Sequence, residues 1–141
     1  MSKLRIVLAI TTLAVALTAL PAAAQDDAAV PAVVSGTILL PEGAILPAGT
    51  VINVEIQETS RADAAAVTIS VLSMEAPGAT SPVPFALSLL PEALEEQGDY
   101  TLSIGIESPD GTLLYINDWA IRAIDESGPI TDVVAELIAV Q

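Results

Sequence analysis

The sequence predicts an all-β protein, a single antiparallel β-sandwich of about seven to eight short strands, preceded by a cleaved signal peptide. Three observations support this fold class. Apolar and polar residues alternate in several short segments, turn residues separate these segments at intervals of about ten residues, and 141 residues suit one domain. Because the sequence contains no cysteine, the fold must rest on one hydrophobic core without disulfides.

The strands are predicted from rows of apolar residues at every second position. Successive strand residues point to opposite faces, so such rows indicate antiparallel strands with one face on a core and the other in water. Along the chain, the rows expected to point inward are Val34, Gly36 and Ile38; Ile52, Val54 and Ile56; Val67, Ile69 and Val71; Val83, Phe85, Leu87 and Leu89; Tyr100, Leu102, Ile104 and Ile106; and Leu114 and Ile116.

Several segments between and after these rows have their own signals. Pro82 and Pro84 restrict their strand to a sheet edge, and the first strand is the second expected edge. Residues 91–97 suit a single helical turn, and 108–111, Ser-Pro-Asp-Gly, predict a hairpin turn. Residues 132–140 fit both a helical stripe and a strand, and their β-branched content favours a strand.

Residues 1–24 have the three parts of a secretory signal peptide. Lys3 and Arg5 precede an apolar run at 6–20, and Ala22-Ala23-Ala24 supplies a small-residue cleavage site. A membrane anchor is the alternative interpretation. The apolar run is shorter than the ~20 residues that a spanning helix needs, and no positive charge follows it. We therefore expect cleavage.

Cleavage defines the expected domain organisation. Residues 25–32 form a short flexible leader, and residues 33–141 form the folded domain. A bacterial lipoprotein needs a cysteine directly after its signal peptide, and the sequence has none. We expect a protein that carries no lipid and no stable membrane anchor.

Net charge excludes some partners. The formal charge is −14, and without Lys3 and Arg5 two arginines face 18 acidic residues, which gives −16. Such a surface repels phosphate backbones and anionic lipids, so nucleic acid is not an expected partner. Solubility or a saline habitat explains the acidity, and attraction to a basic partner is the alternative.

The residue inventory argues against an enzyme. With no histidine, no cysteine and no lysine after Lys3, the chain lacks the usual catalytic triads, zinc ligands and Schiff-base residues. A carboxylate pair can hydrolyse glycosides, but the four aromatic residues are too few for a typical sugar cleft. Asp110, Asp118 and Asp125 lack the close spacing of a calcium loop. No cofactor and no metal is expected.

A set of short motifs resembles the YbaY/YscW-like family. The resemblance spans Val34 to Val140. The motifs that carry it are Ser35-Gly36-Thr37, Leu46-Pro47-Ala48-Gly49-Thr50, Gln57-Glu58-Thr59-Ser60-Arg61-Ala62-Asp63-Ala64, Pro84-Phe85, Tyr100, Ile104, Ile106, Gly111 and Asn117-Asp118.

The resemblance implies a β-sandwich of the bacterial cell envelope. Most members of that family are lipoproteins, and one branch acts as chaperone or pilotin for an outer-membrane secretin of type III secretion. This chain departs from the pattern because it has no lipidation cysteine. The resemblance therefore implies a periplasmic protein, with an extracellular location as the alternative.

Two segments contain the candidate partner-binding residues. Arg61 and Asp63 lie between two predicted strands, where they either stabilise a turn or grip the carboxylate of a partner. Asn117 and Asp118 can hydrogen-bond a turn, while Trp119 either packs at the sandwich rim or anchors an interface.

These observations leave three hypotheses of function. The first is a non-catalytic periplasmic protein-binding or chaperone-like module whose edge strands accept a client envelope protein. The second is a structural envelope domain without a specific ligand, and the third is a carboxylate-based hydrolase. The sequence does not predict the oligomeric state.

Overall fold

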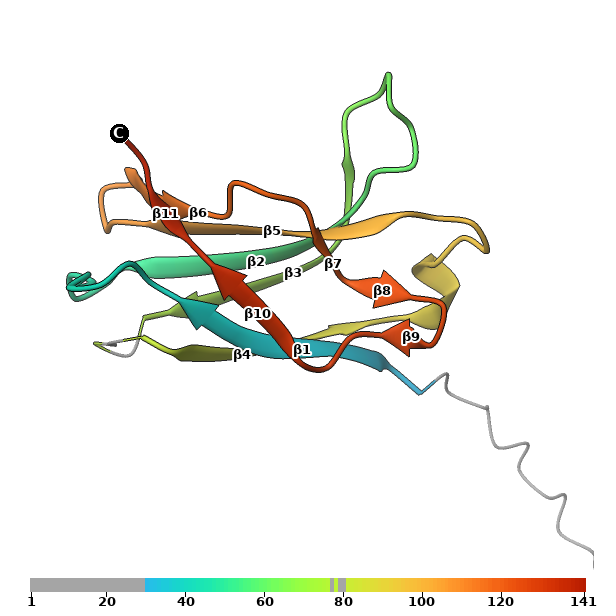
Figure 1. The fold of residues 1–141 in the computed structure, drawn as a ribbon, viewed down its shortest axis with the longest axis horizontal. Coiled ribbons are helices and arrows are strands. Elements are labelled where there is room, and N and C mark those ends of the chain that lie inside the picture. Colours follow the sequence, from blue (N-terminus) through green and yellow to red (C-terminus); the bar gives the residue numbers. More distant parts are fainter. Residues whose placement is uncertain (1–29, 77, 79–80) are drawn as a thin grey trace, which may run out of the picture.

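The computed structural model describes residues 30–76, 78 and 81–141, so the signal peptide expected at 1–24 lies outside the described residues. Two layers of strands face each other, with the C-terminal strands crossing in front (Figure 1). The elements are β1 (Ala32–Leu39), β2 (Val51–Glu58), β3 (Val67–Glu75), β4 (Val83–Leu89), η1 (Pro91–Ala93), β5 (Tyr100–Glu107), β6 (Leu113–Ile116), β7 (Ile121–Arg122), β8 (Ile124–Asp125), β9 (Gly128–Pro129), β10 (Val133–Glu136) and β11 (Ile138–Ala139).

The strands form two main sheets, which confirms the predicted all-β sandwich. One sheet has the order β10-β1-β4, and the larger one has the order β11-β6-β5-β2-β3, with β7 also paired to β5. A small third sheet joins β8 and β9. Strand pairs are antiparallel except β1 and β10, which run parallel. Four of the strands, β7, β8, β9 and β11, have only two residues each.

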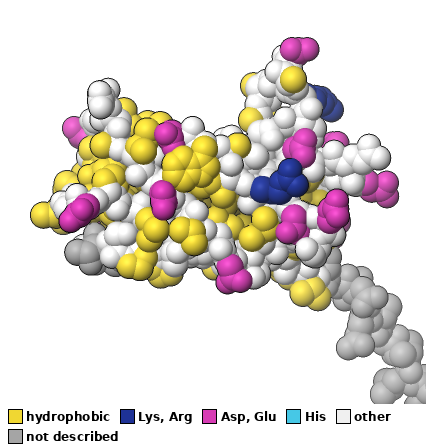
Figure 2. Space-filling view, in the orientation of Figure 1, with side chains coloured by type: hydrophobic (Ala, Val, Ile, Leu, Met, Phe, Trp, Pro, Cys, Tyr) yellow, Lys and Arg dark blue, Asp and Glu magenta, His cyan; other side chains and the backbone are white. Residues whose placement is uncertain are grey.

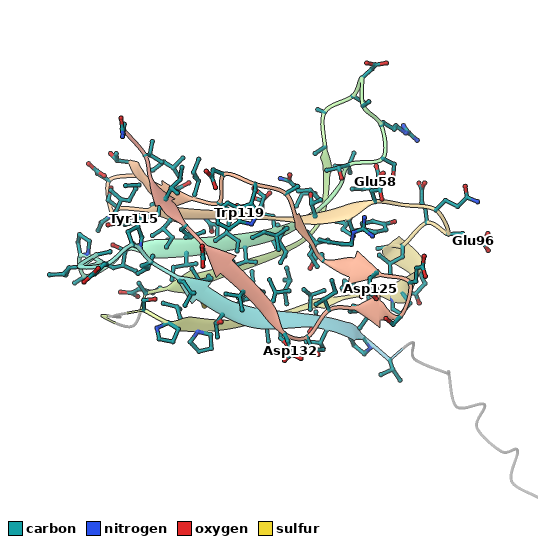
Figure 3. The ribbon with its side chains drawn as sticks, viewed as in Figure 1. Glu58, Glu96, Tyr115, Trp119, Asp125 and Asp132 are labelled. Carbon is teal, nitrogen blue, oxygen red and sulfur yellow. The ribbon has the colours of Figure 1, made fainter. Side chains whose placement is uncertain are left out.

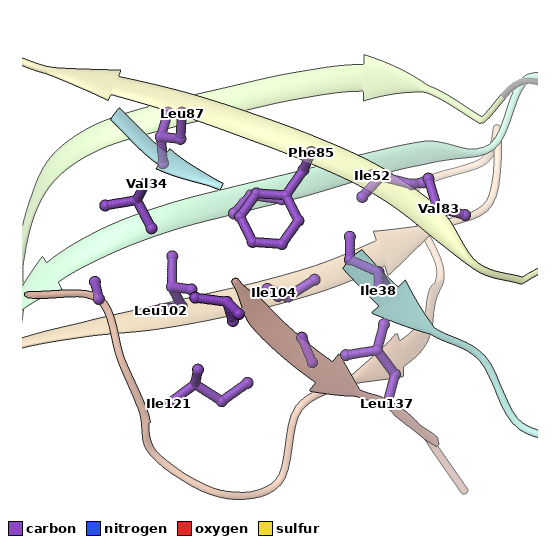
Figure 4. Close-up of a cluster of buried hydrophobic side chains, with 14 of the residues drawn as sticks. Val34, Ile38, Ile52, Val83, Phe85, Leu87, Leu102, Ile104, Ile121 and Leu137 are labelled. Atoms are coloured by element: carbon purple, nitrogen blue, oxygen red, sulfur yellow. The ribbon is translucent and has the colours of Figure 1, made fainter. Parts of the chain in front are cut away.

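The hydrophobic core lies between the two main sheets (Figure 4). Alternation works as predicted in β2, β4 and β5, whose inward residues are all buried and whose outward neighbours are not. Leu102 of β5 and Val34 of β1 belong to this one cluster, so the two layers share a single core. Among the described residues, no helix is long and apolar enough to cross a membrane.

The predicted inward row of β3 holds only at Ile69, which packs against the core, whereas Val67 is 58% exposed. A β-bulge lies opposite Ile56 and Gln57 of β2, and it shifts the register of β3 by one residue. Ser70 therefore pairs with the buried Ile56, whereas Val71 pairs with Glu55 and is 55% exposed. A one-residue slip moves every later side chain to the opposite face, so Leu72 and Met74 face the core instead.

The predicted inward row of β6, Leu114 and Ile116, is also wrong. Tyr115 pairs with the buried Ile106 and packs against the core, whereas Ile116 pairs with Gly105 on the outer face of the sheet.

The prediction that β1 is an edge strand is also wrong. β1 pairs with β4 on one side and with β10 on the other, so it lies in the centre of its sheet. The C-terminal segment is a strand, as the sequence favoured, and it serves both sheets. β10 pairs with β1, then Leu137 donates its N–H to the carbonyl of Leu39, and β11 pairs with β6.

The shorter predicted elements are confirmed. A 3-10 turn at Pro91–Ala93 follows β4. The hairpin between β5 and β6 closes with a bond from the Gly111 N–H to the Ser108 carbonyl (2.9 Å), and Gly111 has φ +84°, a conformation that favours glycine.

Candidate functional site

Asn117 is a structural link between strands. β6 and β7 pair in succession with the same side of β5, and Asn117 lies in the gap between them. Its Oδ1 accepts the Ile104 N–H (2.7 Å), and its Nδ2 donates to the carbonyls of Leu102 (3.1 Å) and Trp119 (2.9 Å). The side chain therefore replaces the backbone bonds that a continuous strand would make to β5.

Trp119 and Asp118 both point into solvent from the loop that follows Asn117. Asp118 is exposed, and Trp119 remains 45% exposed although it is the largest apolar side chain of the protein. Because the Trp119 carbonyl is fixed by Asn117, the loop presents the indole from a defined backbone position. In the view of Figure 3, Trp119 is drawn just above β10, in the connection between β6 and β7.

Arg61 and Asp63 lie on the loop between β2 and β3, which projects from the sandwich (Figure 1). Both side chains are exposed. At the base of the loop, Ser60 accepts the Asp99 N–H through its hydroxyl (2.8 Å) and donates its own N–H to Glu58 (2.8 Å). The Ser60 hydrogen bonds, with a smaller contribution from the charge of Arg61, lower the pKa of Glu58.

A hollow of about 290 Å³ lies between the two predicted segments. Thr59 lines it from the base of the projecting loop, and Ala120 and Arg122 line it from the residues after Trp119. Arg122 was not among the predicted site residues. The sequence feature that could have indicated Arg122 is the apolar–charged–apolar order Ile121-Arg122-Ala123. In the structure, Ile121 and Ala123 are buried and Arg122 between them is exposed. The two predicted segments therefore flank one hollow. Among the described residues, no hydrogen bond joins the side chains of one segment to those of the other.

Exposed apolar side chains occur at Trp119 and along the C-terminal strands β10 and β11. We define the C-terminal apolar patch as Trp119, Val134, Ile138 and Val140, which are all at least 41% exposed. β11 brings Ile138 opposite Ile116 of β6, and Val140 donates its N–H to the Leu114 carbonyl (2.9 Å). Figure 2 shows apolar side chains concentrated over β6, β10 and β11, with acidic residues between them. The sequence analysis selected only Trp119 from this patch.

The carboxylates of the described residues do not converge on a metal site. No group of three or more acidic side chains there could hold a metal ion. The Asp110 carboxylate accepts hydrogen bonds from the Ser108 hydroxyl and the Thr112 N–H within its own turn. These bonds, that of Ser108 first, lower the pKa of Asp110. Asp125 likewise accepts the Ser127 hydroxyl (2.7 Å) and N–H (2.8 Å), which lower its pKa, with a smaller effect of the Arg122 charge.

We expect the substitution Asp125→Asn to make the protein less stable than the wild type at neutral pH. In acid, the difference in stability between the two should disappear. The folded state lowers the pKa of Asp125. The ionised carboxylate therefore stabilises the fold above about pH 4, and this contribution disappears as the pH falls through the folded pKa. Urea midpoints of the wild type and the variant at neutral and acidic pH measure the difference. Asp132→Asn controls for the loss of one negative charge, and a gap that widens in acid contradicts the prediction.

Comparison with known proteins identifies the family of this chain. The profile of the family described as type III secretion system lipoprotein chaperone (YscW) matches residues 29–134. The chain belongs to this family. Its fold is similar to an alternative pilotin from the type II secretion system of Vibrio cholerae, with a TM-score of 0.72 and 28% sequence identity. The match covers 79% of this chain and 98% of the pilotin, whereas no curated protein matches the chain.

Membership in the YscW family confirms the resemblance stated from the sequence motifs. The family is one of secretion-system chaperones, which supports a non-catalytic, chaperone-like role. Both the family and the similar pilotin belong to secretion systems of the bacterial envelope.

Proposed function

We propose that this protein is a periplasmic chaperone-like module that binds a segment of an envelope protein through the C-terminal apolar patch. The observation that carries the proposal is the exposed indole of Trp119 on a rigid loop, in a member of a secretion-chaperone family. Tryptophan is enriched among the residues that dominate binding energy at interfaces. The partner proposed is a secretin of the outer membrane, the class of client that the family resemblance implies.

The chemistry of the patch defines the segment that it would bind. Val134 and Ile138 supply apolar surface on either side of Glu136, and Asp118 and Asp132 add exposed carboxylates close to Trp119 and Val134 in the sequence. An amphipathic segment that combines apolar side chains with lysine or arginine complements this surface. Arg61, Asp63 and the hollow with Arg122 form the border of the proposed site and would contact acidic groups of the same partner.

The proposed location is the periplasm, reached through the signal peptide at 1–24. The sequence contains no cysteine for a lipid anchor, although the family is named for lipoproteins. We propose that the protein acts without its own lipid, so that it would hold the client rather than tether it to the membrane. A structural envelope domain with no specific ligand is the competing function, and the following experiment separates the two.

We expect Trp119→Glu to abolish capture of the secretin while the fold is retained. A charge at the centre of an apolar contact is desolvated without a partner, so binding should weaken by about thirtyfold or more. The measurement is affinity capture from detergent-solubilised envelope with the domain 25–141, scored for secretin by mass spectrometry. Trp119 is the only tryptophan, so its fluorescence also reports burial when the purified secretin is added to the wild type.

Leu90→Glu is the matched control. Leu90 is 57% exposed and follows β4, which lies on the opposite side of β1 from β10. It should capture secretin as the wild type does. Equal capture by Trp119→Glu would remove the patch from the interface, and no secretin above background with the wild type would favour the structural domain.

A further inference from the structure

β3 presents unpaired backbone groups along one edge of the larger sheet. The Ala76 N–H donates to the Thr50 carbonyl (2.8 Å), which makes this residue pair a hydrogen-bonded one in the β2–β3 ladder. In an antiparallel ladder such pairs alternate with pairs whose backbone groups point away. The residues that direct N–H and C=O groups to the outside are therefore Val71, Ser73 and Glu75, and no described residue bonds to these backbone groups.

The other strand on this side of the sandwich is protected. The Ser70 hydroxyl donates to the Ser88 carbonyl (2.7 Å), so the outward backbone groups of β4 belong to Ser88 and to every second residue before it. Pro84 is one of these residues and has no N–H to offer. On the far side, β10 and β11 connect the two sheets. β4 approaches the beginning of β3 at Ser70, whereas the outward backbone groups of Val71, Ser73 and Glu75 have no hydrogen-bond partner among the described residues.

The side chains beside this edge define what would bind there. On the inner face, Leu72 and Met74 are half-buried and pack against the core, so apolar side chains of an added strand would extend that core. On the outer face, Glu75 is the exposed carboxylate of β3 itself. Glu55 lies one strand further in, opposite Val71, and already accepts hydrogen bonds from Gln57 (2.9 Å) and Thr68 (3.1 Å). A second copy of this chain is disfavoured by charge, because each copy carries a net charge of −16 once Lys3 and Arg5 are removed.

From this geometry we infer that the β3 edge binds an extended segment of a basic partner protein by strand addition. The segment alternates apolar side chains, which lie beside Leu72 and Met74 on the inner face, with lysine or arginine side chains, which lie beside Glu75 on the outer face. Its backbone bonds to the outward N–H and C=O groups of Val71, Ser73 and Glu75. This surface is separate from the C-terminal apolar patch, because β3 and β11 are at opposite ends of the larger sheet.

The test uses a capped peptide that alternates lysine and valine over seven residues, added to isotope-labelled domain 25–141. We expect it to shift the amide signals of Val71, Ser73 and Glu75 and to slow their hydrogen exchange. Ser73→Pro removes one outward N–H and leaves the β2–β3 ladder intact, whereas Ser73→Ala keeps that N–H. The peptide should bind Ser73→Pro about tenfold more weakly than Ser73→Ala. Proline cannot donate the backbone hydrogen bond at position 73, and its ring keeps the peptide backbone away from β3.

Two further peptides, tested on the wild-type domain, check the inference even if Ser73→Pro does not fold. A lysine–valine peptide with methylated backbone nitrogens at alternate positions should not bind the wild type, and a glutamate–valine peptide should not bind either. Trp119→Glu should leave binding of the lysine–valine peptide unchanged, which separates this surface from the proposed function. Signal changes away from β3, equal binding of the glutamate–valine peptide, or pairing of two copies in sedimentation would overturn the inference.

Discussion

The substitution Gly36→Ala should destabilise the protein by about 3 kcal/mol or more, because β1 and β10 are too close for a side chain. A Cβ atom at position 36 would overlap the carbonyl oxygen of Val133 and lie 2.8 Å from its carbonyl carbon. Both are backbone atoms of β10, so no rotamer change relieves the overlap. Urea unfolding gives the loss of stability, and faster amide exchange in β10 locates it.

Gly105→Ala is the matched control, since it is a second glycine inside a strand. Its Cβ would meet only the Cδ1 atom of Leu113, at 3.3 Å, which is the end of a flexible side chain. This substitution should change stability by less than about 1 kcal/mol. If both variants lose stability equally, the parallel contact of β1 with β10 is not the cause.

The substitution Asn117→Ala should cost about 2 to 4 kcal/mol, since it removes the acceptor for the Ile104 N–H and the donor to the Leu102 and Trp119 carbonyls. Chemical denaturation measures the loss. The Ile104 amide should exchange much faster in the variant. The fluorescence of Trp119 should also change, because its carbonyl loses the bond that fixes the loop.

Asn117→Asp separates the two halves of this link. The carboxylate still accepts the Ile104 N–H, but it cannot donate to the Leu102 and Trp119 carbonyls while it is ionised. The variant should be less stable than the wild type at neutral pH, and the deficit should shrink in acid as the carboxyl gains a proton. A deficit independent of pH would mean that the donor half contributes little.

Regular alternation made most of the sandwich predictable from the sequence. In β5, the row from Tyr100 to Ile106 is buried as the pattern indicates. In β3 the same rule failed at Val71, because a bulge has no signature in the order of apolar and polar residues. The central position of β1 also escaped prediction, because a partner strand near the C-terminus leaves no local sign around Gly36.

The candidate site was predictable only in part. Trp119 was selected from the sequence with two interpretations, packing at the sandwich rim or anchoring an interface, and it is 45% exposed. Its apolar neighbours Val134 and Ile138 were read only as strand residues, since exposure depends on which face of β10 and β11 is covered. Asn117 bonds the loop that follows it, through the Trp119 carbonyl, as expected, and it also bonds β5, a contact that requires knowledge of the strand pairing.

The parallel pairing of the first and last long strands has a consequence for biosynthesis. Ser35 donates its hydroxyl to the carbonyl of Thr131, 96 positions later in the chain, and the central strand of the smaller sheet gains its second neighbour only there. The native state therefore cannot form on the ribosome before the final residues emerge, and contacts so distant in sequence form slowly. A chain built in this way completes its smaller sheet only after β10 has been synthesised.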